Sequence, residues 1–351
     1  DRKPPLPGVG GGRRPAPRTP RMSLAEFALI DRIRARSKGR DDIVLGIGDD
    51  AALLQPLAGH WLAVTADTLN SGVHFPPETL PADIGWKTLA VNLSDVAAMG
   101  ATPAWGTLAL SLPEASAAWI DAFADGFFAL ADAHDWRLIG GDTTRGPLSL
   151  SVTAFGQVPH GQALRRDGAQ VGDDIWVSGT LGDAAGALAL WQRGELDVTR
   201  PAADAETEFL RQRLLRPVPR VQLGLALRSI ATAAVDVSDG LMADLGHIAA
   251  RSGVAAHVDA DLLPCSTALQ RVLGSEAARS CALQGGDDYE LCFTAAVTSR
   301  RRLLALSGEL GISLTRIGAM LHGEGVHCPG SGAVHGYVHF LSPPMAAGDQ
   351  S

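Results

Sequence analysis

Acidic residues gather in six short segments, most of them beside glycine. These segments are Gly48-Asp49-Asp50, Asp67, Asp95, Gly140-Gly141-Asp142, Asp236-Val237-Ser238-Asp239-Gly240 and Gly285-Gly286-Asp287-Asp288. Most of them follow an expected strand or lie in a turn, and strand ends form the ligand crevice of an α/β fold. Carboxylates that converge there repel one another unless a hard cation neutralises them. Mg²⁺ suits this role because it binds through one or two carboxylates, water and phosphate oxygens.

Each acidic segment also has a purely structural explanation. An Asp in a turn commonly bonds its own backbone, and Asp239 is well placed to cap the helix expected after it. Asp95 is the most informative of the set, because the stretch AVNLSDVAAMG predicts an apolar helix in which a charge needs a partner. Six purely structural clusters in one chain are less expected than a shared site.

The elements that would position these acids form two α/β blocks. In the first, hydrophobic patterning predicts strands at 43–47, 61–66, 104–112, 136–139 and 148–158, with helices at about 82–99 and 116–134. In the second, it predicts strands at 175–179, 233–237, 254–260 and 290–295, with helices at about 183–193, 207–215, 219–231 and 239–251. A turn-rich segment at about 159–173 separates the blocks.

The expected fold is therefore α/β (α+β) with two domains. We expect an N-terminal domain at 22–160 and a C-terminal domain at 161–345. Residues 1–21 are rich in Pro, Gly and Arg and are expected to be a disordered leader, and residues 346–351 a tail.

Composition excludes several classes of protein. The formal net charge of −8 argues against nucleic acid as the main partner. No segment reaches the length of uncharged apolar sequence that a membrane span needs. The G-x-x-x-x-G-K-[ST] motif of P-loop enzymes is absent. The four cysteines lack a C-x-x-C pair, so reduced thiols in a cytoplasmic protein are expected.

Six motifs, in order and at the expected spacing, resemble the thiamine-monophosphate kinase family. They are GIGDDAALL (46–54), TADTLNSGVHF (65–75), KTLAVNLSDVAAMGATPAW (87–105), LIGGDTTRG (138–146), VDVSDGLMADLGHIA (235–249) and GGDDYELCF (285–293). This family belongs to the superfamily of aminoimidazole ribonucleotide synthetase and selenophosphate synthetase. The resemblance, which runs from about residue 23 to 340, implies mixed sheets flanked by helices. It implies an N-terminal domain that binds ATP and Mg²⁺ and forms the homodimer, and a C-terminal domain that completes the active site. It also implies Mg²⁺-dependent transfer of the ATP γ-phosphoryl group to thiamine monophosphate, giving thiamine diphosphate and ADP.

The resemblance further implies roles for single residues. Metal ligands fall on Asp50, Thr65, Asp67, Asp95, Asp142, Asp236 and Asp239. Contacts to ATP fall on Gly141, Arg166 and Ser238, and contacts to the acceptor on His74, Asp287 and Tyr337. The acceptor is a phosphate monoester, whose second pKa is about 6, so its oxygen needs no general base. Alignment and charge neutralisation should dominate, and no catalytic residue apart from the metal site is expected.

Two positions depart from the family's pattern, and two other functions stay open. Relatives often have a hydroxyl residue before the equivalent of Asp67, where this chain has Ala66. They also place an aromatic residue near the C-terminus to stack on thiamine; here Val334 is near that place and Tyr337 is the substitute. The alternatives are another ATP-dependent enzyme of the superfamily and a non-catalytic module that binds Mg²⁺ and nucleotide. Selenophosphate synthetases carry a reactive Cys near the N-terminus, whereas the first cysteine here is Cys265.

Overall fold

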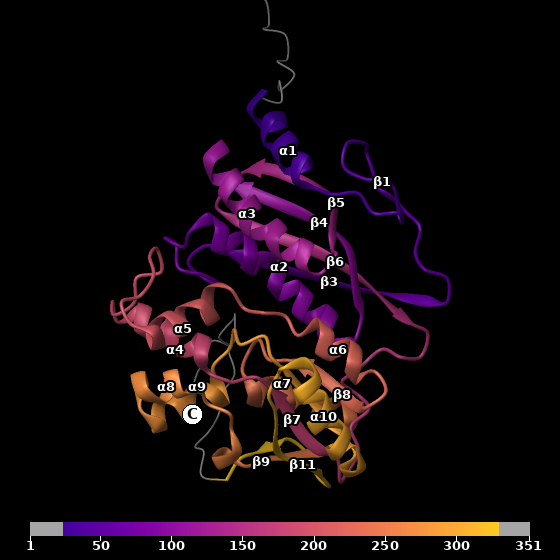
Figure 1. Ribbon diagram of the computed structural model, residues 1–351, viewed down its shortest axis with the longest axis vertical. Coiled ribbons are helices and arrows are strands. Elements are labelled where there is room, and N and C mark those ends of the chain that lie inside the picture. Colours follow the sequence, from indigo (N-terminus) through magenta and orange to yellow (C-terminus); the bar gives the residue numbers. More distant parts are fainter. Residues whose placement is uncertain (1–23, 330–351) are drawn as a thin grey trace, which may run out of the picture.

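The computed structural model describes residues 24–329, which form two halves, each built on its own sheet (Figure 1). The helices of the first half are α1 (Leu24–Arg36), α2 (Pro81–Ala98) and α3 (Ala117–Ala133). Its strands are β1 (Ile43–Leu45), β2 (Leu53–Leu54), β3 (His60–Asn70), β4 (Thr102–Leu112), β5 (Arg137–Arg145) and β6 (Ser149–Pro159). Strands β1 and β2 pair with each other. The main sheet has the order β3-β6-β4-β5, in which β4 and β5 are parallel and the other pairs antiparallel.

The second half is built on a sheet of order β12-β9-β11-β7-β10-β8. Its strands are β7 (Asp174–Ser178), β8 (Ala231–Asp236), β9 (Ala255–Val258), β10 (Leu291–Ala295), β11 (Leu314–Leu321) and β12 (Val326–His327). Its helices are α4 (Asp183–Gln192), α5 (Ala205–Leu215), α6 (Val221–Leu227), α7 (Leu241–Ser252), α8 (Thr267–Leu273), α9 (Ser275–Gln284) and α10 (Arg300–Leu310). The pair β9 and β12 is parallel and the other pairs are antiparallel. These mixed sheets with flanking helices confirm the predicted fold class.

The two sheets are covered differently. In the second half, α7 and α9 contribute to one apolar cluster and α6 and α10 to another, so helices pack on both faces of the sheet. In the first half, α2 and α3 pack on the sheet through a core that includes Phe123 and Trp136. Leu62 and Val64 of β3 are exposed, because they alternate with the residues that face the helices. This face of the four-stranded sheet is therefore open along β3 in the described chain, whereas Ile43 and Leu54 of β1 and β2 pack on it at Trp105.

Helix α2 is shared by the two halves. It packs on β3, β6 and α3 in its own half and contacts α6 and β8 in the other. Its crossing with α3 depends on two glycines: a Cβ on Gly85 would lie 2.1 Å from the Phe123 carbonyl oxygen, and one on Gly126 would lie 1.8 Å from that of Ala82. Because α3, the first sheet and the second half all pack on it, α2 is buried on almost every side.

The structure corrects several expected boundaries. Strands β3 and β5 extend further than predicted, so Asp67 and Asp142 lie within strands rather than after them. Both are edge strands, where natural sheets often carry charged residues, including inward-pointing ones. Helix α6 ends at Leu227 instead of 231, because Ala231 already pairs with β10. The predicted leader, the tail and Tyr337 lie outside the described residues. None of the described helices is long and apolar enough to cross a bilayer.

Candidate active site

Predicted metal ligands from both halves meet beside α2. A cavity of about 400 Å³ is lined by Asp67 of β3, Asp95 of α2, Asp236 at the end of β8 and Asp239 in the following turn. Thr65 lies two residues before Asp67 on β3, and its hydroxyl donates a hydrogen bond to Asp95. The fold therefore brings five of the seven predicted ligands to one place.

Polar residues of α2 hold these acids in position. The Ser94 hydroxyl donates to Asp236 Oδ2 (2.6 Å), which joins α2 to the second half. The side-chain oxygen of Asn92 accepts from the backbone N–H of Asp67 (3.1 Å). Neither Asn92 nor Ser94 was predicted as a site residue, because small polar side chains within a helix give no distinctive signal in a single sequence.

Burial and mutual repulsion raise the pKa values of the acids. Burial, together with the charges of neighbouring acids, raises the pKa of Asp67 to about 6. The pKa of Asp95 is raised by burial, against the lowering effects of the Thr65 hydrogen bond and the Arg166 charge. Complete burial and the Asp95 charge raise the pKa of Asp236. A cation beside these carboxylates would favour their ionised forms.

The donor atoms of this cluster are of the type that Mg²⁺ binds. Every predicted ligand side chain ends in a carboxylate or a hydroxyl, and hard cations prefer such oxygens. Within residues 24–329, no three Asp, Glu, His or Cys side chains are grouped closely enough to hold a metal ion by themselves. Mg²⁺ usually completes its octahedron with water and phosphate oxygens. The cluster therefore fits a metal that is bound together with a phosphate ligand.

Asp244, in the first turn of α7, is a member of the cluster that the sequence analysis missed. Its Oδ2 accepts hydrogen bonds from the backbone N–H groups of Ser238 (2.9 Å) and Asp239 (3.0 Å). Asp239 makes no side-chain cap to α7, so the capping explanation for that residue is wrong. Burial raises the pKa of Asp244 to about 7. The sequence could have indicated Asp244 in the same way as Asp95, because both are carboxylates within an apolar helix.

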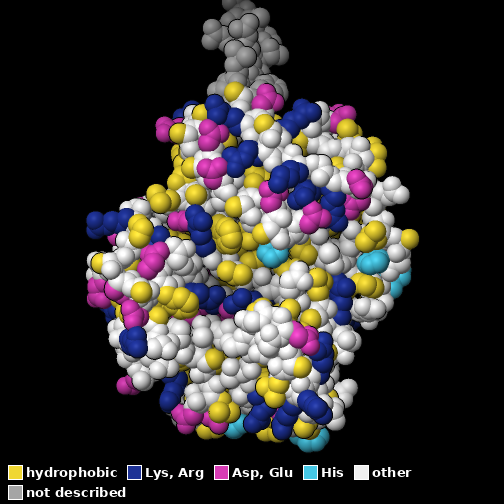
Figure 2. Space-filling view, in the orientation of Figure 1, with side chains coloured by type: hydrophobic (Ala, Val, Ile, Leu, Met, Phe, Trp, Pro, Cys, Tyr) yellow, Lys and Arg dark blue, Asp and Glu magenta, His cyan; other side chains and the backbone are white. Residues whose placement is uncertain are grey.

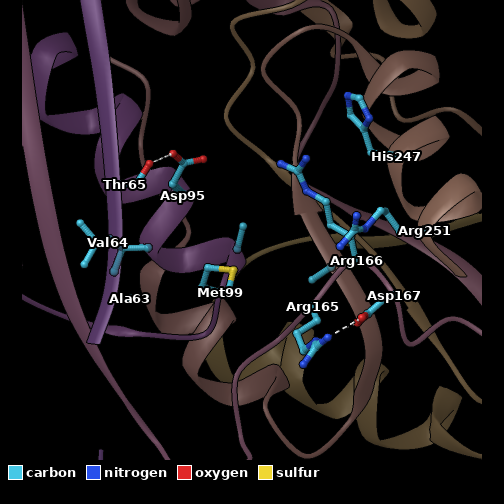
Figure 3. A pocket seen from close by; sticks show the side chains of 13 residues that line it. Ala63, Val64, Thr65, Asp95, Met99, Arg165, Arg166, Asp167, His247 and Arg251 are labelled. Carbon is cyan, nitrogen blue, oxygen red and sulfur yellow. Dashed lines mark hydrogen bonds and ion pairs between the residues drawn. The ribbon is translucent and has the colours of Figure 1, made fainter. Parts of the chain in front are cut away.

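A second cavity of about 520 Å³ shares Asp95 with the first. Figure 3 shows Thr65 and Asp95 on one side and Arg166, Arg251 and His247 on the facing side. Arg166 was predicted to contact ATP, whereas Arg251 and His247 were missed, since an Arg in the last turn of a helix is usually solvated. Basic side chains also gather between the two halves on the surface seen in Figure 2. An acidic wall facing a cationic one suits a polyphosphate with a bound cation.

The predicted acceptor contacts lie at the other end of the first cavity. His74 and Asp287 both line it. The Asn70 backbone N–H donates to His74 Nδ1 (3.0 Å), so the proton of the neutral ring is on Nε2. Lys87 Nζ donates to Asp287 Oδ2 (3.0 Å) and the Tyr289 hydroxyl to Oδ1 (2.9 Å). The Asp287 carboxylate is thus fixed on both sides.

Asp142, Gly141 and Asp50 are not brought to this cluster. Across the sheet, one row of paired residues runs through Asp67, Val152, Leu108 and Gly141. Three strand spacings, or about 14 Å, separate the ends of that row. Asp142 lines a different cavity, next to α1, and Asp50 is exposed between β1 and β2.

Ala66, where relatives often have a hydroxyl, points away from the cluster. Successive strand residues point to opposite faces, so Ala66 lies on the exposed face and Thr65 and Asp67 on the other. A hydroxyl at this position would not reach the acids of its own chain. The departure therefore removes no donor from the cluster described above.

A buried ion-pair network supports residues 285–290, which carry Asp287. Glu290 is fully buried and accepts hydrogen bonds from Arg220 (2.5 and 2.6 Å), Arg213 (3.0 Å) and Ser178 (2.6 Å). Asp288 accepts from the backbone N–H of Gly182 (2.6 Å). These contacts tie the segment to the end of β7 and to α5.

The sequence matches two families along most of its length. Residues 48–158 match the N-terminal domain of AIR synthase related proteins, and residues 170–328 match the C-terminal domain. Relatives from Salmonella typhimurium and Escherichia coli, both named thiamine-monophosphate kinase, are 49% identical over 92% of this chain and 100% of their own length. The chain belongs to the thiamine-monophosphate kinase family. The prediction drawn from the six motifs is thus confirmed.

Solved structures of the thiamine-monophosphate kinase family have the same fold. The enzyme from Stenotrophomonas maltophilia is 73% identical and superimposes with a TM-score of 0.84, covering 89% of this chain and 99% of its own. AaThiL complexed with AMPPCP and TMP is 33% identical, with a TM-score of 0.72, covering 90% of this chain and 97% of its own. Thiamine-monophosphate kinases are phosphotransferases, which confirms the predicted enzyme class.

Proposed function

We propose that this chain transfers the γ-phosphoryl group of ATP to thiamine monophosphate, giving thiamine diphosphate and ADP. The observation that carries the proposal is the row of acids from both halves beside α2, with a cationic wall on one side and the pair His74 and Asp287 on the other. The relatives named thiamine-monophosphate kinase and the AaThiL complex with AMPPCP and TMP support the same substrates.

The residues act by placing two anionic phosphates in line. Arg166 and Arg251 would bind phosphate oxygens of ATP, and Ser252 fixes the Arg166 carbonyl through a hydrogen bond (2.9 Å). Ser238 and Gly141 are further proposed ATP contacts. His74 and Asp287 would hold the acceptor. Because the acceptor oxygen is already anionic, the barrier consists mainly of alignment and charge repulsion.

We further propose that the acids hold Mg²⁺. Asp67, Asp95, Asp236 and Asp239, with Thr65, would be the ligands on this side of the site. When bound, Mg²⁺ neutralises phosphate charge during transfer. Burial, together with the charges of Asp95 and Asp239, raises the pKa of Asp67 to about 6, and this crowding of buried acids supports a cation here.

Metal binding should leave a signature in the pH dependence of stability. With EDTA, Asp67 and Asp244 keep their protons up to pKa values of about 6 and 7, whereas the unfolded chain releases them near 4. The native state then binds more protons than the unfolded state, so these groups lower stability as pH rises from about 4 to about 7. Added Mg²⁺ should therefore raise Tm more at about pH 7.5 than at about pH 5.5. Calorimetric scans would measure both trends, and an equal Mg²⁺ effect at the two pH values would contradict the metal site.

We also propose that the chain forms a homodimer through the face of the four-stranded sheet that β3 leaves open. Leu62 and Val64 on β3 are 45% and 58% exposed, and an apolar strand surface of this kind suits a second copy of the same chain. Asp142 and Asp50 then remain proposed metal ligands whose place is at this interface rather than beside Asp95. The cytoplasm is the proposed location, because cysteines that form no disulfide, such as Cys265 and Cys292, suit a reducing compartment.

The first experiment is product formation. The purified chain should convert thiamine monophosphate to thiamine diphosphate with ATP and Mg²⁺, as followed by chromatography, and EDTA should abolish the product. Light scattering on the same sample should give about twice the chain mass of 36.5 kDa. ATP binding without product would instead favour another acceptor within the superfamily, or a non-catalytic module.

A further inference from the structure

The chain contains one lysine in an unusual environment. Only three of its 30 Lys and Arg residues are lysines, at positions 3, 38 and 87. Lys38 is exposed and pairs with Asp132 (2.6 Å) on the surface. Lys87, on α2, has a side chain that is only 2% exposed. Burying an ammonium group is costly unless a carboxylate pairs with it, so the position of Lys87 needs an explanation.

Lys87 contacts the acceptor end of the site through a single carboxylate. Its Nζ donates to Asp287 Oδ2 (3.0 Å), while the Tyr289 hydroxyl holds Oδ1 (2.9 Å). Asp287 is 29% exposed and lines the cavity, whereas Lys87 is not among the residues that line it. Asp287 is therefore the cavity-lining side chain that Lys87 contacts.

The segment that carries Asp287 needs such support. Asp287 and Tyr289 both adopt positive φ angles, 68° and 51°, which are unfavourable for residues other than glycine. Their backbone N–H groups donate to the carbonyls of Ser238 (2.9 Å) and Val237 (2.8 Å). The Tyr289 ring packs into the apolar core of the first half. The ion pair between Lys87 and Asp287 adds a charged contact to this apolar one, and both join the second half to the first.

The distance from Lys87 to the acids limits what it can do. Lys87, Val91 and Asp95 occupy positions i, i+4 and i+8 of α2, which lie along the same side of the helix. At 1.5 Å per residue, Lys87 is about 12 Å from Asp95 along the axis. The Asp287 pair is therefore at the far end of the cavity from the proposed phosphoryl transfer.

We propose that Lys87 is a positioning residue, which fixes the Asp287 carboxylate so that it can bind the acceptor. This inference rests on the proposed function, because it takes the molecule in this cavity to be thiamine monophosphate. It goes beyond that function by assigning acceptor affinity to a buried residue that does not touch the acceptor. The ammonium group also offsets the charge of Asp287. This carboxylate therefore offers a fixed oxygen that can accept a hydrogen bond from the substrate, rather than an unpaired negative charge.

The test is a set of variants assayed by steady-state kinetics. Lys87→Met should raise KM for thiamine monophosphate about tenfold, the loss expected for one charged hydrogen bond. It should leave kcat and KM for ATP within about threefold of the parent. Tyr289→Phe, which keeps the ring in the core, should raise the same KM less. Lys38→Met, which removes the exposed lysine pair, should change neither constant.

A double-mutant cycle separates positioning from a general structural role. If Lys87 acts through Asp287, adding Lys87→Met to Asp287→Asn should change KM by less than about twofold. Independent, multiplying effects would overturn the proposal, as would a fall in kcat with unchanged KM. Should Lys87→Met fail to fold, Lys87→Gln, which also removes the charge, takes its place, and an unchanged KM for thiamine monophosphate in that variant would overturn the proposal. Absence of product from the parent enzyme would refute the proposed function instead, so the two failures are distinguishable.

Discussion

Asp95→Asn is expected to reduce kcat by about a thousandfold or more while the protein stays folded. Asp95 lines both cavities, so its carboxylate lies between the cationic wall and the acceptor end of the site. Asn keeps the size of the side chain, and its carbonyl oxygen can still accept from the Thr65 hydroxyl. The substitution removes negative charge from a crowded acidic cluster, so it should not lower stability in the absence of metal.

Steady-state assays beside circular dichroism would test this expectation. The matched control is Asp125→Asn on α3, which removes an exposed carboxylate paired with Arg36 (2.7 Å) and should leave kcat unchanged. A folded Asp95→Asn variant with kcat within about threefold of the parent would refute the assignment of Asp95 to the metal site.

Glu290→Gln is expected to cost about 3 kcal/mol of folding free energy, the low end for breaking a buried ion pair. Glu290 is fully buried, and its two oxygens accept from Arg213, Arg220 and Ser178. An amide in its place turns an –NH₂ donor toward other donors and leaves buried positive charge short of a partner. Asp183, 3.5 Å from Arg213, offsets part of this loss.

Urea unfolding would measure the cost. Glu309→Gln is the matched control, because Glu309 pairs with Arg302 (2.6 Å) on the surface and its loss should cost less than about 1 kcal/mol. Equal unfolding midpoints for the two variants would show that the buried network adds no more stability than a surface ion pair.

The sequence predicted site residues best where a charged side chain lies within an otherwise apolar segment. Asp95 could be predicted because a carboxylate in an apolar helix needs a partner. Asn92 and Ser94 occur in the same motif but were missed, because their roles depend on which acids from β3 and β8 come to face α2. Lys87 was missed for the same reason, since its partner is 200 residues away in the sequence.

Strand boundaries were harder to predict than strand positions. The pattern placed β3 and β5 but ended them early, because Asp67, Asp142 and the adjacent glycines resemble turn residues. Their strand conformation follows from pairing with β6 and β4, which lie at a distance in the sequence. No expectation was formed for α8, α9, α10 or the central strand β11, whose short stretches gain their definition from the elements they pack on or pair with.

Lys87, Val91 and Asp95 lie along one side of α2, so this helix fixes the distance between the two ends of the site. Substitutions on this side can change chemistry at one end of the site while the other end stays in place. An insertion of one residue between Lys87 and Asp95 would instead rotate one side chain relative to the other by about 100° and shift it by about 1.5 Å. The two side chains could then not both face the cavity. The glycine crossing with α3 prevents the helix from turning to compensate. Substitutions on this side of α2 leave the spacing of Lys87 and Asp95 unchanged, whereas an insertion does not.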